Sequence, residues 1–214
     1  MKTHGLLILS AILLSAPEVW SQERPQGPPS MRTPDDLPSR VQDAPTPHPT
    51  QTLERRRERV LFLLSGYEFF PSRDDLGPGT DAELSAELRA IASDPALRPS
   101  LRARAIKALG YFDDDATSEA LTRWANVDMR RVKPKLRATA DAMRHSAIAS
   151  LARARGPRAL PSLVVLFTHD DLQVRVSALR AAGSIGPSAH DTLRAQRPHA
   201  RTDLERDTID ALLR

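Results

Sequence analysis

The 214-residue chain contains no cysteine. This absence excludes disulfide bonds, cysteine zinc ligands, thiol catalysis and lipid anchoring through an amino-terminal cysteine. Aromatic residues are also scarce, at 4% of the chain, so Leu, Ala, Ile and Val must fill any core. A core rich in Ala and Leu and poor in aromatics favours packed helices over a β-sandwich.

Lysine is nearly absent as well. Of the 31 basic residues, only Lys2, Lys107, Lys133 and Lys135 are lysines. The basic residues exceed the acidic ones by only four, which gives a formal net charge of +4. Solvated helix faces account for an excess of this size, and it does not indicate a nucleic-acid partner.

The first fifty residues lack an apolar run of the roughly 20 residues that cross a bilayer. They hold Lys2, an apolar stretch of 11 residues at 6–16, and the small side chains of Val19 and Ser21. This order is typical of a secretory signal that is cleaved after Ser21. We therefore expect residues 1–21 to be a signal peptide and the mature protein to be exported, either to the periplasm or out of the cell.

Residues 22–50 carry eight prolines and little apolar periodicity. Proline fixes φ and removes a backbone donor, and so few apolar side chains cannot offset the entropy of ordering. We expect this segment to be an extended, disordered linker to a helical domain at 51–214. A proline-rich docking motif is the alternative interpretation.

Residues 51–214 show helical periodicity, and no segment alternates with period two over the length of a strand. Thr80 followed by Glu83 predicts a capping box at the start of one helix. Breaks rich in Pro, Gly and Asp separate the predicted elements. The expected helices span 51–70, 81–93, 100–112, about 115–125, 134–155, 157–168, 171–183, 188–197 and 202–214.

Four strings in this part of the chain share one pattern. They are "LRARAIKALG" from Leu101, "MRHSAIASLA" from Met143, "VRVSALRAAG" from Val174 and "LERDTIDALL" from Leu204. Apolar or small residues at i, i+4 and i+5 place one apolar stripe along each predicted helix. The strings begin 42, 31 and 30 residues apart, which leaves room for a second helix after each of the first three.

The strings "DLQVR" at 171–175, "AIKALG" at 105–110 and "AAGSIGP" at 181–187 resemble HEAT and HEAT-like repeats. The intervals of 30 and 31 residues fit the shorter, HEAT-like variety better than the full-length period of about 40 to 47 residues. The resemblance implies an all-α fold, an α-α superhelix or α-solenoid of about four helical pairs. Such units stack because one pair cannot bury its apolar face alone.

Two details of the stack follow from the pattern. Gly110, Gly156, Gly183 and Gly186 fit helix ends, where a left-handed residue closes the last turn. An Asp before the repeated Arg could cap one helix and pair with an arginine along the stack. In the aligned strings only Asp171 occupies that place, so we do not expect a continuous Asp–Arg ladder.

Candidates for catalysis are weak. The runs "THDD" at 168–171 and "FDDD" at 112–115 are typical of helix-capping turns, and a stack would place them at opposite edges. His145 occupies a variable position of the pattern, which favours an exposed or packed side chain. The chain has no HExxH, GxSxG or phosphate-loop motif. We therefore predict a protein that is not an enzyme and that uses no metal and no cofactor.

The first unit is about eleven residues longer than the others, and the excess falls near 127–139. This stretch contains "RRVKPKLR", with basic residues Arg130, Arg131, Lys133, Lys135 and Arg137. An insertion on one face of a solenoid often contacts a partner, whereas the alternative is a solvated charge run. Trp124 nearby is either a core residue or an exposed anchor.

Together these features favour a non-catalytic, exported scaffold that binds another protein, with these five basic residues as the candidate binding site. The alternative hypothesis is an anion-binding module of the cell envelope. In that case the arginine-rich helix faces and residues 130–137 would hold a phosphate-bearing or acidic polymer. Export makes a nucleic-acid partner the less favoured choice.

Overall fold

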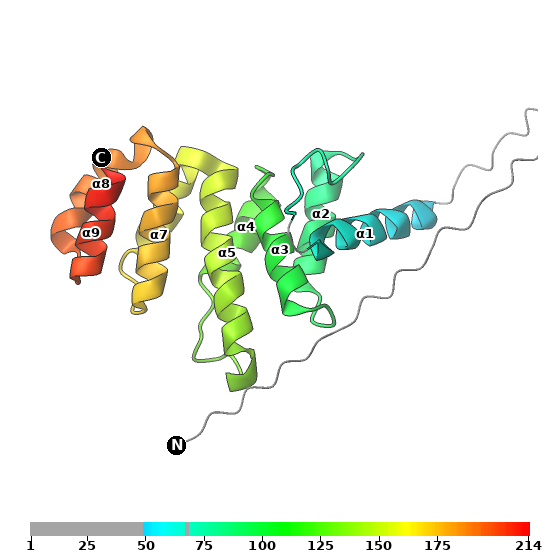
Figure 1. Cartoon of the computed structure of the whole chain (residues 1–214), viewed down its shortest axis with the longest axis horizontal. Coiled ribbons are helices and arrows are strands. Elements are labelled where there is room, and N and C mark those ends of the chain that lie inside the picture. The colour runs from blue at the N-terminus through cyan, green and yellow to red at the C-terminus, as the bar shows by residue number, and fades with distance from the viewer. Residues whose placement is uncertain (1–48, 67–68) are drawn as a thin grey trace, which may run out of the picture. The chain divides into compact units, whose positions relative to one another are not determined.

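The computed structural model describes residues 49–66 and 69–214 (Figure 1). The predicted signal peptide and all but the last two residues of the predicted linker lie outside these ranges. Within them every regular element is an α-helix or a short 3-10 helix and no strand occurs, so the all-α prediction is confirmed. The α-helices are α1 (Pro49–Ser65), α2 (Asp81–Ser93), α3 (Pro99–Leu109), α4 (Asp115–Ala125), α5 (Arg137–Arg155), α6 (Leu160–Leu166), α7 (Leu172–Ser184), α8 (His190–Gln196) and α9 (Asp203–Leu212).

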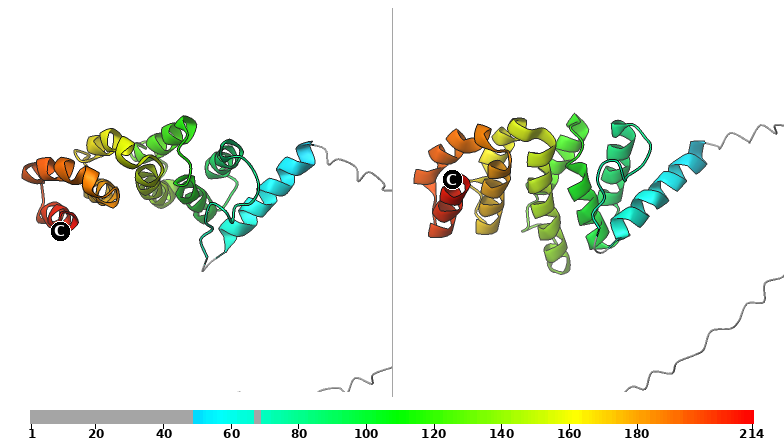
Figure 2. Two further views of the ribbon diagram at one scale, coloured as in Figure 1. Left: turned by 90° about the horizontal axis from the view of Figure 1, so that it is seen from above. Right: turned by 45° about the horizontal axis from the view of Figure 1, so that its top comes forward.

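The helices of residues 49–214 lie in two layers (Figures 1 and 2). One layer holds α1, α3, α5, α7 and α9, and each of these helices packs against the next one in the row. The other layer holds α2, α4, α6 and α8, which pack mainly against helices of the first layer. Seen from above in Figure 2, the row bends, and the first layer lies on the inner side of the bend.

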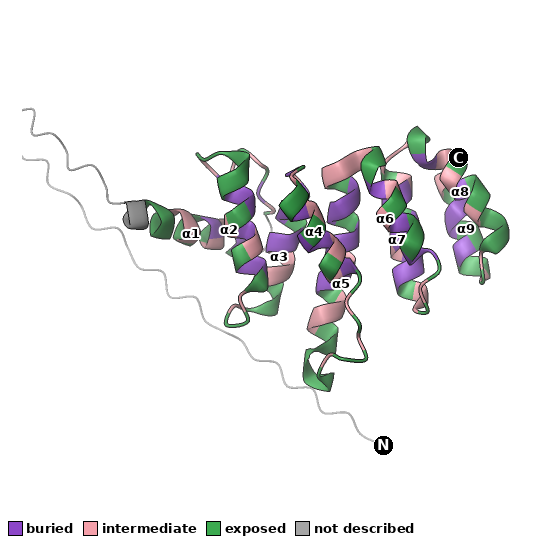
Figure 3. Cartoon of the chain, turned by 180° about the vertical axis from the view of Figure 1, so that it is seen from behind, coloured by how far each residue is buried: buried purple, intermediate pink, exposed green. Residues whose placement is uncertain are grey.

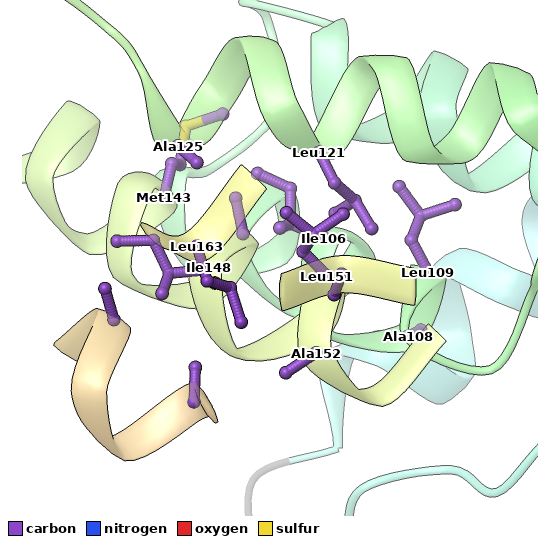
Figure 4. Close-up of a cluster of buried hydrophobic side chains, with 14 of the residues drawn as sticks. Ile106, Ala108, Leu109, Leu121, Ala125, Met143, Ile148, Leu151, Ala152 and Leu163 are labelled. Atoms are coloured by element: carbon purple, nitrogen blue, oxygen red, sulfur yellow. The ribbon is translucent and has the colours of Figure 1, made fainter. Parts of the chain in front are cut away.

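The apolar stripes of the repeated strings form the core between the layers. All but one of the stripe residues of the first three strings are buried, and Leu101 is partly buried against the same core; the buried ones are Ala105, Ile106, Leu109, Met143, Ala147, Ile148, Leu151, Val174, Ala178, Leu179 and Ala182. Figure 4 shows side chains of α3, α4 and α5 meeting in the middle of the array. Exposed residues occupy the outer surfaces of the helices and the loops (Figure 3). The core is therefore continuous along the row, as expected for stacked helices.

Capping side chains fix the starts of several helices. Thr80 caps α2 in the predicted capping box, since its side chain accepts the amide of Glu83 at 3.3 Å and Glu83 accepts the amide of Thr80 at 2.9 Å. Asp114 caps α4 and Asp171 caps α7. The aspartates of the two acidic runs thus act as helix caps, as predicted.

Two of the four glycines lack the predicted left-handed conformation. Gly156 and Gly186 have positive φ, at 52° and 88°, and lie where α5 and α7 give way to short 3-10 turns. Gly110 ends α3, as predicted, but with φ −63°, and Gly183 lies inside α7. A Cβ on Gly183 would lie 2.4 Å from Leu212 of α9, so this glycine serves close approach of two neighbouring helices rather than a left-handed turn.

Several helix boundaries also differ from the sequence prediction; for example, α3 ends at Leu109 rather than at 112, and α6 spans Leu160–Leu166 rather than 157–168. Helix α1 ends at Ser65 rather than near residue 70, and Gly66 follows it directly. Helix α5 begins at Arg137, because residues 134–136 form a separate 3-10 turn. Pro134, which begins this turn, has no backbone amide to donate within a continuing helix.

Buried arginines link successive helices of the first layer. Arg144 of α5 is 2% exposed and donates to Asp171 at the start of α7, at 2.6 Å. Arg175 of α7 is 5% exposed and donates to Glu205 of α9. The equivalent Arg102 of α3 instead donates to a main-chain carbonyl of α2 at 2.9 Å. The Asp–Arg pairing is therefore discontinuous along the row, as expected. The Arg175–Glu205 pair is a second link between helices that the sequence pattern did not predict.

Candidate interaction surfaces

The basic segment at 130–137 lies on one edge of the array, in the connection between α4 and α5 (lower edge in Figure 1). It holds the start of α5 and the 3-10 turn Pro134–Leu136. Each of its predicted binding residues is exposed, namely Arg130, Arg131, Lys133, Lys135 and Arg137. We call residues 130–137 the basic edge segment.

Ion pairs within and near this segment are loose. Arg130 lies 3.6 Å from Asp170, and both side chains are 87% exposed. Arg131 lies 3.3 Å from Asp128, with the arginine side chain 88% exposed. Exposed pairs of this kind contribute at most about 1 kcal/mol. No carboxylate of the described residues lies within 4.0 Å of the two lysine ammonium groups, so most of the charge remains open to a partner.

An apolar cavity of about 210 Å³ lies beneath the segment. Its wall includes Trp124 of α4, Val132 and Leu136 of the connection, and Met143 of α5. Trp124 is half-buried and packs against the core, as the core interpretation predicted. Leu136 is 48% exposed, which leaves an apolar side chain beside the cations.

A second cavity, of about 390 Å³, separates the edge segment from the turn before α7. Arg130 and the buried Arg144 line it, together with Asp170 and Asp171. Burial alone would raise the pKa of Asp171, but hydrogen bonds from Arg144 and from the amide of Gln173 outweigh it and lower the pKa below its usual value. This carboxylate is therefore already engaged in capping and pairing.

The acidic run at 113–115 lies at the opposite edge, as the sequence predicted. Asp113 and Asp115 pair with Arg155, at 3.3 and 2.9 Å. Arg158 also pairs with Asp113. These contacts join the turn after α3 to the turn after α5, and they explain the acidic run without a ligand.

The five predicted binding residues do not converge on one point. Arg130 lines the cavity next to Asp170, whereas Val132 and Leu136 face the cavity next to Trp124. The arrangement therefore offers an extended strip of positive charge beside apolar side chains rather than an enclosed pocket. Within 52–66 and 69–214, His, Asp and Glu side chains form no group of three that could hold a metal ion.

A groove of about 430 Å³ between α5 and α7 was not found from the sequence. It lies on the first layer and is lined by His145, Ala149, Arg153, Ser177, Arg180, Ala181 and Ser184. His145 is half-buried, and its Nδ1 lies 2.8 Å from the hydroxyl of Ser177, so it is packed as predicted. We call this the inner groove. The aligned strings place Lys107 and Arg180 at one position but have Ala149 there on α5, so the strings alone did not reveal the contribution of Arg153.

Cations and aromatic rings continue from the inner groove towards α3. The guanidinium of Arg153 lies 5.7 Å from the centre of the Tyr111 ring, and that ring lies 6.4 Å from Phe70. The ammonium of Lys107 lies 4.3 Å from the Phe70 ring, and the guanidinium of Arg104 lies 5.2 Å from it. The rings hold these cations in place without neutralising them.

No protein-family model, no curated protein and no solved structure matches this chain. None of the helices in the described ranges has the length and apolar character that a membrane span requires.

Proposed function

We propose that the helical domain is a non-catalytic, exported scaffold of the HEAT-like type that binds another protein through the basic edge segment. The observation that carries this proposal is the open strip of basic side chains beside Leu136 and the apolar cavity of Trp124. Charged rims around an apolar centre are the usual anatomy of a protein interface. The segment also projects from the one connection that is longer than its counterparts, so it adds surface without disturbing the stack.

Affinity capture tests the proposal. The full chain would be compared with a Lys133→Gln/Lys135→Gln variant and with an Arg55→Gln/Arg214→Gln variant as the control of equal charge. Arg55 lies in α1 and Arg214 follows α9, both are exposed, and neither belongs to the helices that flank the edge segment. We expect a protein from the cell envelope that is recovered with the wild type and the control but lost with the lysine variant. Equal recovery with all three would refute the role of the edge segment.

An anion-binding envelope module is the second candidate, and the open charges of the edge segment and of Arg153 and Arg180 favour it. Arginine suits phosphate and carboxylate groups because its planar fork donates two parallel hydrogen bonds. Charge-driven binding weakens as ionic strength rises. Binding of a polyphosphate probe that is unchanged from low to high salt would count against this candidate.

A further inference from the structure

We infer that the inner groove binds an extended acidic segment of the partner protein, whose carboxylates are spaced to meet one cation on each successive helix. The inference rests on the proposed function, because it names the chemistry of the partner and a second surface that would contact it. It concerns the inner groove and the neighbouring face of α3, on the opposite side of the first layer from α4 and α6. The edge segment is a separate surface.

The cations of the inner face differ from most other arginines of the domain in lacking carboxylate partners. Arg89, Arg155 and Arg197 pair with carboxylates at 3.0, 2.9 and 2.6 Å. For Arg153 and Arg180, no carboxylate of the described residues lies within 4.0 Å. Both are exposed, and both line the same groove. Two like charges on facing helix surfaces repel each other weakly in water, and an anionic group between them would remove that cost.

One cation per helix sets a spacing. Lys107 lies in α3, Arg153 in α5 and Arg180 in α7, and these helices pack side by side in that order. Packed helices have axes roughly 8 to 10 Å apart. A polyproline II chain has three residues per turn and a rise of about 3.1 Å, so every third side chain lies on one edge at about 9.3 Å intervals. An acidic residue at every third position would therefore match successive helices.

The surface between the cations suits a backbone rather than a bulky polymer. Ala149 and Ala181 line the groove with small side chains, which let a chain approach closely. The hydroxyl of Ser184 donates to the carbonyl of Ala181 at 2.7 Å, so its oxygen can accept a hydrogen bond from a peptide amide. Polyproline II chains leave their backbone groups unpaired, so this oxygen offers a partner that the chain itself lacks. The groove is open, so a chain can enter it from the side.

The charge pattern also argues against a long polyanion. The position of α9 that aligns with Ser177 is Asp207, which is exposed. A phosphate chain that followed the whole row would meet this carboxylate at α9, and its phosphates lie closer together than the helices do. A short segment with separate carboxylates meets the cations of α3, α5 and α7 and can end before α9.

Fluorescence anisotropy with labelled synthetic peptides tests the inference on the full chain. The probe is (Glu-Pro-Pro) repeated five times, and its controls are (Gln-Pro-Pro) repeated five times and a peptide with five glutamates in adjacent positions. We expect the first peptide to bind more tightly than either control. We expect Arg153→Gln/Arg180→Gln to weaken that binding by about fivefold or more, because two ion pairs are lost. Lys133→Gln/Lys135→Gln, which removes the same charge, should change it by less than about twofold.

A charge reversal guards against an effect on folding. Arg153→Glu/Arg180→Glu should reject the glutamate peptide and accept (Lys-Pro-Pro) repeated five times, and helical circular dichroism should remain unchanged. Loss of binding in the lysine variant alone would overturn the inner groove and leave the proposed edge interface intact. Equal binding of the spaced and adjacent glutamates would overturn the spacing. Binding of polyphosphate or anionic lipid vesicles without binding of the spaced peptide, or no binding of any probe, would overturn the acidic segment.

Discussion

Replacing Glu205 by alanine should destabilise the carboxyl-terminal end of the array far more than removing an exposed carboxylate of the same helix. Glu205 is 3% exposed and accepts a hydrogen bond from the buried Arg175. Its other oxygen accepts the amides of Arg201 and Thr202, at 2.9 and 2.8 Å. The alanine variant therefore leaves a buried guanidinium without its carboxylate and removes the capping box of α9 at the same time.

The magnitude follows from burial. Breaking a buried ion pair by removing one partner costs roughly 3 to 5 kcal/mol, because the remaining charge is uncompensated. For a domain of this size each kcal/mol corresponds to roughly 2 to 4 °C, so the midpoint should fall by about 6 to 20 °C. Arg175 keeps two main-chain acceptors, the carbonyls of His169 and Asp170 at 2.8 and 2.9 Å, which favours the lower half of that range.

Thermal unfolding followed by circular dichroism gives the comparison, with Asp210→Ala as the matched control. Asp210 lies on the same helix and pairs with Arg197 at 2.6 Å, but the two side chains are 37% and 53% exposed. Removing it should cost much less than removing Glu205, because water and salt screen an exposed pair. An Arg175→Met/Glu205→Gln variant should recover part of the stability, because no unpaired charge remains. If Glu205→Ala were no more harmful than Asp210→Ala, the buried pair would not have the role that we assign to it.

Four further outcomes can be measured. The pKa of Asp171 is lowered in the folded state. The ionised carboxylate therefore stabilises the fold above the pKa of the unfolded state, and this stabilisation is lost as pH falls through the pKa of the folded state. Asp171→Asn should accordingly lose less stability than the wild type between about pH 6 and about pH 3. Ile148→Val should cost about 0.5 to 1.5 kcal/mol in urea unfolding, whereas Phe62→Ala, at a side chain 77% exposed, should be close to neutral. Gly186→Ala should cost about 1 to 3 kcal/mol, because φ is 88° and an alanine adopts this backbone conformation only with strain. Steric contact plays no part, since no atom lies within 4 Å of the added Cβ. Amino-terminal sequencing of exported protein should begin near Gln22, and an uncleaved cytosolic product would overturn the predicted export.

Helix positions were predictable where local chemistry alone decides them. The bounds of α2 and α4 match the expected 81–93 and 115–125, since the side chains of Thr80 and Asp114 cap their starts. The apolar stripes were predictable for the same reason, because their period is set by the helix itself. The prediction of a longer helix at 51–70 was wrong because its apolar residues continue beyond the point where Gly66 ends the helix.

Contacts between helices were harder to predict. Arg144 and Arg175 occupy the same place in their strings, yet their carboxylate partners lie 27 and 30 residues away and at different points of the next helix start. Asp171 is the residue before α7, whereas Glu205 lies within the first turn of α9. A search for Asp at one fixed position finds the Arg144–Asp171 pair and misses the Arg175–Glu205 pair.

The two glycine corrections have a common cause. Gly110 and Gly183 end the same ten-residue pattern, and in a single helix each reads as a stop signal. In the array they face the next helix of the first layer: a Cβ on Gly110 would lie 3.3 Å from the backbone of Ser150, and one on Gly183 would meet Leu212. Their requirement for a small side chain comes from a neighbour distant in sequence, which no local pattern contains.

The distribution of arginine explains how a formal charge of only +4 can still define binding surfaces. Arginines between helices are buried and paired, as at Arg144 and Arg175, so they stabilise the stack and contribute little external field. The exposed cations without a carboxylate within 4.0 Å include Lys133 and Lys135 of the edge segment and Arg153 and Arg180 of the inner groove. Charge averaged over the chain therefore underestimates the local field that a partner meets, since opposite charges neutralise each other between helices but not on these two faces.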